Sequence, residues 1–204
     1  MAAVGEQDLF VMADRYLSGV VGQIGADRWD RVVPRDPSGP PDRTTTVRDL
    51  VVAVAHDDAW VPDMVAGRSM EQVGAHAYDG DLLGDEPAAA FDQVVRRACS
   101  AVLAAEDLDR TAHCSFGDFT VKEYLWQVTS YRGLQGWDLT GPVGADRTMP
   151  PELVQGMWDQ LQPVVDQWRE MGVFPPAVPV DTDAPLQDRL LGLTGRDPAA
   201  PPAP

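Results

Sequence analysis

The sequence predicts an all-α protein, a bundle of four long helices with an additional C-terminal helix and irregular loops. Apolar residues recur at three- and four-residue spacing over four long stretches of the 204-residue chain, which is the spacing of one helix face. Segments rich in proline and glycine separate these stretches, and strand-forming residues gather in only one short segment. Long helices joined by irregular loops are typical of a helical bundle.

The first helix is expected over residues 6–25, where an apolar stripe recurs at helical spacing. Residues 34–43 contain four prolines and one glycine and are expected to form a loop. The second helix is expected to begin at Thr46 and to reach Val65. Thr46 and Asp49 have capping-box spacing, so each can satisfy an end group of this helix.

The third helix is expected over residues 86–105, with Phe91 and Val95 on its buried stripe. Residues 111–116 are rich in strand-forming types and are expected to form an isolated extended stretch. No second strand is expected beside it.

The fourth helix is expected to begin at Thr120, because Thr120 and Glu123 repeat the capping-box spacing. It is expected to end near Thr140, because Gly141 and Pro142 follow and both disfavour continuation of a helix.

The C-terminal part is expected to contain a fifth helix over residues 151–171 and a short last helix over 186–193, joined by a proline-rich bridge. Residues 1–195 are therefore interpreted as a single domain. The remaining residues, 196–204, are rich in proline and alanine and are expected to be a disordered tail.

The charge balance indicates which partners are disfavoured. The chain has 32 acidic and 16 basic residues and a formal net charge of −16, which repels nucleic acid and anionic membranes. No apolar run is long enough to span a bilayer, the first ten residues lack a signal-peptide pattern, and two cysteines suit a reducing compartment. We expect a cytoplasmic protein, monomeric or homodimeric, whose partner is a small molecule rather than nucleic acid or a membrane.

Two segments resemble a known family. They are TTTVRDLVVAVAHDDAWVPDMVAG, residues 44–67, and EYLWQVTSYRGLQGWDLTGPVGAD, residues 123–146. Together they resemble the DinB-like family of metal-binding helical bundles, which includes the N-terminal domain of mycothiol-dependent maleylpyruvate isomerases. The resemblance implies a DinB-like bundle and three metal ligands on the second and fourth helices. The matching positions hold Ala53, Tyr131 and Gln135, which are poor ligands or none, so we expect neither a metal nor another cofactor.

The resemblance also places an active cavity between the second and fourth helices. Helical spacing then selects the residues that face it or flank it: Ala53, His56, Asp57 and Trp60 on the second helix, and Tyr124, Val128, Tyr131, Arg132, Gln135 and Asp138 on the fourth.

His56 is the strongest catalytic candidate, because a neutral imidazole transfers protons near neutral pH. Asp57 or Asp138 would orient its ring. Alternatively, His56 is a partly exposed residue on a solvated helix face. Tyr131 and Gln135 would hold a carbonyl or hydroxyl oxygen, or they only fill the vacated polar space.

Arg132 would clamp a substrate carboxylate through a bidentate contact, or it points outward and pairs with an acidic neighbour. Cys114 follows His113, and this pair suggests a thiolate nucleophile. Neighbouring residues of an extended strand point to opposite faces, however, which disfavours this role.

Two function classes remain open. The first is a metal-independent enzyme of specialised metabolism that catalyses an isomerisation, elimination or cyclisation of a small carbonyl-containing metabolite by proton transfer. His56 would be the acid or base, and Tyr131 and Asp57 would assist it. The alternative is a non-catalytic binding, resistance or regulatory protein derived from a thiol-dependent metalloenzyme. A tight cavity in which His56 and Tyr131 converge favours the enzyme, and a wide apolar trough favours binding.

Overall fold

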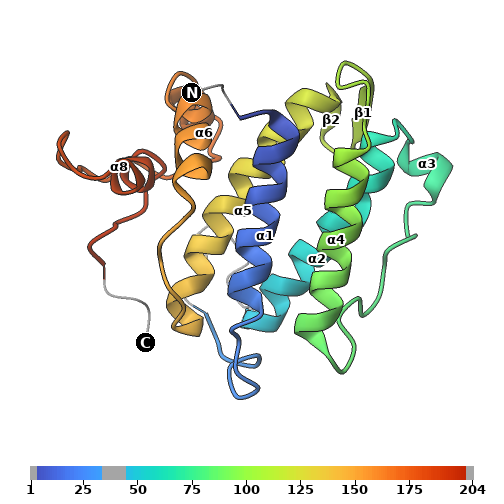
Figure 1. Cartoon of the computed structure of the whole chain (residues 1–204), viewed down its shortest axis with the longest axis horizontal. Coiled ribbons are helices and arrows are strands. Elements are labelled where there is room, and N and C mark those ends of the chain that lie inside the picture. The colour runs from blue at the N-terminus through green and yellow to red at the C-terminus, as the bar shows by residue number, and fades with distance from the viewer. Residues whose placement is uncertain (1–3, 34–44, 201–204) are drawn as a thin grey trace.

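The computed structural model describes residues 4–33 and 45–200, and within them the chain is mainly helical, as the sequence predicts. Four long helices pack side by side (Figure 1). α1 packs against α4 and α5, and α2 packs mainly against α4. Their bounds are α1 Glu6–Val21, α2 Val47–Val65, α4 Pro87–Leu103 and α5 Val121–Val143.

The core of the molecule lies between these four helices, where Phe10, Phe91 and Leu125 are fully buried. A second apolar cluster joins α5 to the C-terminal helices. Gly136 allows α1 and α5 to approach closely, because a Cβ at this position would lie 2.7 Å from the ring of Tyr16. Burial of such side chains is the main favourable term in folding.

The capping boxes are confirmed at both expected helix starts. Thr46 caps α2 together with Asp49, and Thr120 caps α5 together with Glu123. In each case the threonine hydroxyl accepts a hydrogen bond from a backbone N–H, and the carboxylate accepts one in return.

The expected end of α5 at Thr140 is wrong, because the helix continues to Val143. Pro142 lies in the last turn, where its missing N–H removes a single helical hydrogen bond. The helix stops at Gly144, whose φ of 68° is left-handed. Arg28 donates a hydrogen bond to the carbonyl of Val143 and satisfies one of the terminal acceptors.

The single helix expected over residues 151–171 is also wrong. The structure has two helices instead, α6 Pro151–Leu161 and α7 Val165–Glu170. Pro163 lies in the turn between them. It has no N–H to donate to the carbonyl of Asp159, and its ring clashes with a continuing helix.

A β-hairpin replaces the isolated extended stretch. β1 Thr111–Cys114 pairs antiparallel with β2 Gly117–Thr120. Gly117 has a φ of 141°, which a residue with a side chain rarely adopts, and it closes the tight turn. A further short helix, α3 Met70–Val73, was not predicted from the sequence and has its own capping box at Ser69.

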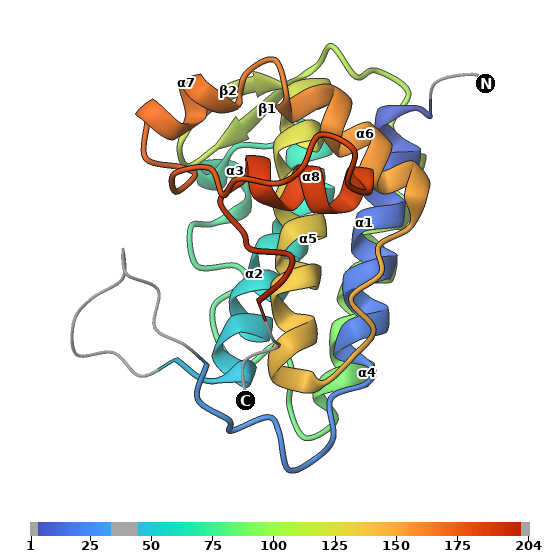
Figure 2. The same ribbon diagram turned by 90° about the vertical axis from the view of Figure 1, so that its left-hand side faces the viewer.

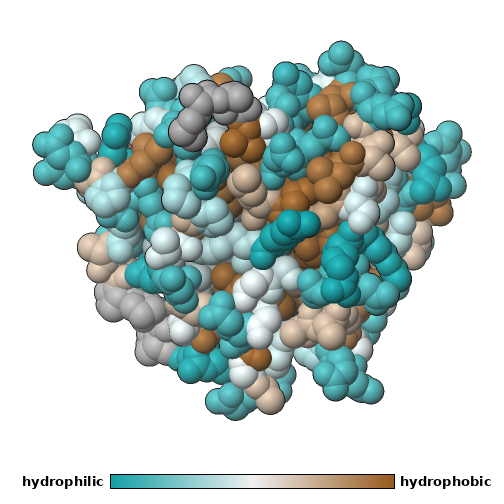
Figure 3. Space-filling model, viewed as in Figure 1, coloured by the Kyte–Doolittle hydropathy of each residue, from teal (hydrophilic) through white to brown (hydrophobic). Residues whose placement is uncertain are grey.

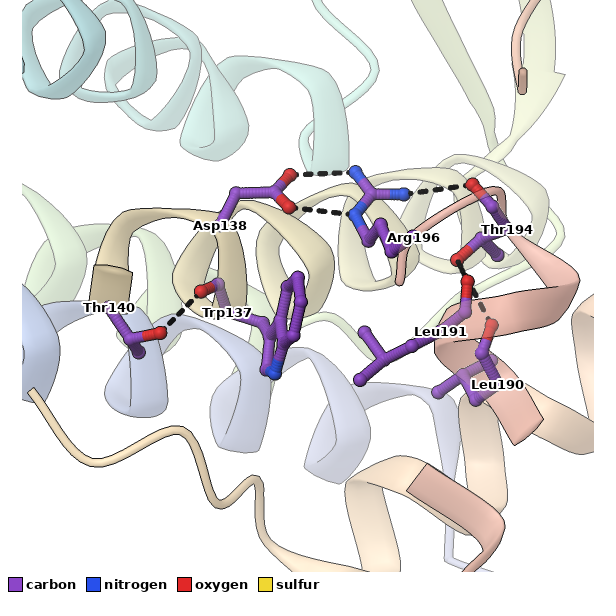
Figure 4. Close-up of polar contacts among 7 residues, drawn as sticks. All are labelled: Trp137, Asp138, Thr140, Leu190, Leu191, Thr194 and Arg196. Carbon is purple, nitrogen blue, oxygen red and sulfur yellow. Dashed lines mark hydrogen bonds and ion pairs between the residues drawn. The ribbon is translucent and has the colours of Figure 1, made fainter. Parts of the chain in front are cut away.

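The last helix, α8 Leu186–Leu193, has the expected bounds. The chain after α8 was expected to be a disordered tail from residue 196. As far as residue 200 it instead lies along α5. Arg196 makes a bidentate ion pair with Asp138, with N–O distances of 2.7 and 2.8 Å (Figure 4). The carbonyl of Ala200 accepts a hydrogen bond from Arg147. Residues 201–204, and the loop expected at 34–43, lie outside the described residues.

Hydrophilic side chains cover most of the face that carries α1 and α4 (Figure 3), in agreement with the large acidic excess. In the described part of the chain, no helix combines the length and the apolar character needed to cross a membrane.

Candidate functional site

A cavity of about 370 Å³ lies between α2 and α5, near the start of α5. Figure 2 shows the hairpin and α7 at this same end of the bundle. Side chains from α2, α3, the hairpin, α5 and α7 form its wall: His56, Asp57, Trp60, Met64, Met70, Cys114, Ser115, Phe116, Tyr124, Gln127, Val128, Tyr131, Arg132 and Trp168. Aromatic and aliphatic side chains dominate this wall, as in most small-molecule sites.

The structure brings seven of the ten predicted site residues to this cavity: His56, Asp57, Trp60, Tyr124, Val128, Tyr131 and Arg132. Helical spacing places them on facing sides of α2 and α5.

The other three predicted residues, Ala53, Gln135 and Asp138, do not line it. The cavity spans only the C-terminal half of α2 and the N-terminal half of α5. Ala53 lies one turn before this region and is exposed. Asp138 lies about two turns beyond Tyr131 along α5 and is held there by Arg196, so a role in orienting His56 is not supported.

Sequence reasoning missed the part of the wall that lies outside the two helices. Phe116, at the hairpin turn, is 64% exposed and lines the cavity, and Trp168 reaches it from α7. Cys114 also lines it. These residues come from separate segments, and helical spacing within α2 and α5 gives no information about them. The strand-forming residues at 111–116 were one signal for this part of the wall, but they were expected to form an isolated extended stretch.

His56 lies at the edge of the cavity with its side chain 41% exposed. Its Nδ1 is 3.9 Å from an oxygen of Asp57, and its Nε2 is 4.0 Å from an oxygen of Asp79. Both distances are too long for direct hydrogen bonds. The imidazole therefore has two nearby carboxylates and is free to bond to a ligand.

Arg132 is 1% exposed, so it is neither the outward-pointing residue nor the free clamp considered from the sequence. Its Nε and Nη2 donate to one oxygen of Asp58, at 2.8 and 2.7 Å. Asp14 lies 3.7 Å from the guanidinium. Both aspartates are completely buried. This buried cluster thus contains one cation and two carboxyl groups.

Burial holds the pKa of Asp14 well above its usual range, and the neighbouring Asp58 adds to the effect. The thiol of Cys99 lies 3.9 Å from Asp14. Burial also raises the pKa of Asp58, while the bound Arg132 opposes this shift. We interpret Asp14 as the protonated member, which leaves one ion pair between Arg132 and Asp58.

Asp14→Asn is expected to flatten the dependence of stability on pH. The carboxyl of Asp14 keeps its proton in the folded state at pH values where the unfolded chain, with a pKa near 3.8, has lost it. The stability that Asp14 contributes is therefore fully present below the pKa of the unfolded state. It is lost as the pH rises through the pKa of the folded state. Urea unfolding between about pH 4 and 8 measures this slope, with Asp8→Asn on the exposed face of α1 as control. Equal slopes in Asp14→Asn and the parent would contradict the assignment.

The Cys114 thiol and the Tyr131 phenol in the wall favour their neutral forms. Burial raises the pKa of the Cys114 thiol to about 11, which makes a thiolate nucleophile unfavourable. His113 interacts with Asp118, with an N–O distance of 2.9 Å. Burial and the nearby Asp57 raise the pKa of Tyr131, so its phenol is a hydrogen-bond donor rather than a phenolate.

Among residues 4–33 and 45–200, no group of three His, Cys, Asp or Glu side chains is arranged to hold a metal ion. The three positions that the sequence resemblance matched to metal ligands also lack a suitable donor set. Ala53 has no donor atom and is exposed, and Gln135 and Tyr131 are weak ligands.

A scan of the sequence against protein-family models, a search of curated proteins and a search of solved structures found no match.

Proposed function

We propose that this protein binds a small organic molecule in the cavity between α2 and α5, with the apolar body of the ligand against the aromatic wall and an oxygen-bearing group toward Arg132 and Tyr131. The observation that carries this proposal is the convergence of Trp60, Phe116 and Trp168 with a few polar groups on one cavity of about 370 Å³. Ligand sites have this combination of an apolar wall and a few polar groups, and volumes of about 300–1,000 Å³.

We also propose that the chain is a DinB-like bundle that has lost the metal site of that family. The packing of α1, α2, α4 and α5 supports this kinship, and so do the resembling segments in α2 and α5. The proposed site lies next to the vacated ligand positions, and its chemistry has to come from its own side chains.

Filling the cavity tests the binding proposal. Val128 lines the cavity on α5 and is half-buried, so Val128→Phe is expected to occupy ligand space while the bundle still folds. We expect aromatic alcohols, ketones, amines or carboxylates to raise the melting temperature of the parent, because a ligand that binds only the folded state stabilises it. Val128→Phe should abolish this increase. Ala53→Phe, on exposed α2 surface outside the cavity, should retain it, and loss in both variants would argue against this site.

Proton transfer by His56 is the second candidate function. It is favoured by the presence of His56 and Tyr131 in the same cavity wall and by the two carboxylates near the imidazole. Incubation of a bound carbonyl compound in D₂O tests it, because an active acid or base exchanges the C–H protons next to the carbonyl. Exchange no faster than in buffer, for every compound that binds, would leave binding as the function.

A further inference from the structure

One residue of the proposed cavity's wall carries a buried hydrogen-bond donor that has no acceptor. Arg132 lines the cavity and is 1% exposed, and its Nη1 has no hydrogen-bond partner among the described residues. Its Nε and Nη2 are already bonded to Asp58. An unpaired buried donor lowers stability, so a ligand acceptor at Nη1 would bring a favourable interaction.

A carboxylate oxygen close to this nitrogen indicates what kind of acceptor fits. Oδ2 of Asp57 lies 3.9 Å from Nη1 of Arg132, and both residues line the cavity. This gap is too long for a direct hydrogen bond, but one oxygen atom can be about 2.8 Å from both ends. Such an oxygen would accept from the guanidinium and donate to the carboxylate. A hydroxyl group does both.

The charges around this position disfavour other ligand classes. The charge of Arg132 is balanced by Asp58, and Asp57 adds a further negative charge beside it. A ligand carboxylate would therefore meet Asp57 at close range without a free cation to compensate it. A ligand ammonium would suit Asp57, but it would face the guanidinium as a like charge and leave Nη1 without an acceptor.

We infer that the ligand of this cavity is an uncharged alcohol or phenol whose hydroxyl bridges Nη1 of Arg132 and Oδ2 of Asp57, with its apolar body between Trp60, Phe116 and Trp168. This inference rests on the proposed binding function and names the ligand class. It replaces the carboxylate that the arginine suggested from the sequence alone. The chain selects against carboxylates through Asp57, which acts as a specificity residue.

Three probes with one bicyclic body and different end groups test this inference: 2-naphthylmethanol, 2-naphthoate and 2-naphthylmethylamine. Calorimetry on the full chain should give the alcohol the lowest dissociation constant, about tenfold below that of the carboxylate, which is the effect of one buried hydrogen bond. Asp57→Asn keeps an acceptor oxygen and removes the charge. It should narrow the difference between alcohol and carboxylate, mainly by improving the binding of 2-naphthoate.

The outcomes separate the two proposals. Tightest binding of the carboxylate or the amine, or an unchanged preference in Asp57→Asn, would overturn the alcohol inference and leave the binding function intact. No binding of any of the three probes would count against the proposed function itself. Asp57 is 53% exposed at its side chain, so Asp57→Asn is expected to fold like the parent.

Discussion

Arg132→Met is expected to lower the free energy of unfolding by about 3–5 kcal/mol, because it leaves a completely buried carboxylate without its cation. Asp58 is bonded to Arg132 through two N–H groups, and both residues are at most 1% exposed. Methionine has a similar length and fills much of the same space. The decrease in the free energy of unfolding is therefore due mainly to the missing positive charge. Urea unfolding at neutral pH measures it.

Two further variants make this result specific. Arg15→Met makes the same replacement on the exposed face of α1 and should change stability by no more than about 0.5 kcal/mol. Arg132→Met combined with Asp58→Leu removes both charges and should recover much of the loss, because a buried ion pair is often replaceable by apolar residues. A double variant as unstable as Arg132→Met alone would mean that packing, rather than the unpaired charge, explains the effect.

His56→Gln is expected to lower the rate of proton exchange or turnover about 100- to 10,000-fold if the chain is an enzyme, since this is the usual contribution of a general acid or base. Glutamine keeps a hydrogen-bonding side chain but cannot transfer a proton near neutral pH. His56 is partly exposed, so folding should be nearly unaffected. The measurement is the rate of C–H exchange in D₂O, or turnover once a product is known.

His76→Gln is the matched control for this experiment. His76 also contacts Asp79, at 2.7 Å, but its side chain is 87% exposed and it does not line the cavity. Its replacement should leave the rate unchanged. Equal rates in His56→Gln and the parent would exclude the catalytic role of His56 and leave the binding function.

Local sequence signals predicted the helices well. The apolar stripes gave the four long helices, and the threonines at 46 and 120 marked two helix starts correctly, because a capping box depends only on residues within one turn. The ends were harder. Pro142 was expected to stop α5 and does not, whereas Pro163 breaks a helix that was expected to continue. Pro142 is followed by only one more helical residue, whereas Pro163 lies in the middle of the stretch that was expected to be one helix.

The site was predictable only where it depends on the periodicity of a single helix. His56, Asp57, Trp60, Tyr124 and Tyr131 are all in the cavity wall. The burial of Arg132 was not predictable, because it depends on carboxyl groups from two other parts of the bundle, on α1 and α2. The contribution of the hairpin and of α7 depends on tertiary packing, which leaves no spacing signal in the sequence.

The indole N–H signals of the six tryptophans test the central claim most directly. Trp60 and Trp168 line the cavity, and Trp29, Trp126, Trp137 and Trp158 do not. We expect titration with 2-naphthylmethanol, followed by ¹H–¹⁵N NMR, to shift the signals of Trp60 and Trp168 together and to leave the other four nearly unchanged. Shifts confined to the other four, or none at the solubility limit of the probe, would contradict a ligand site between α2 and α5.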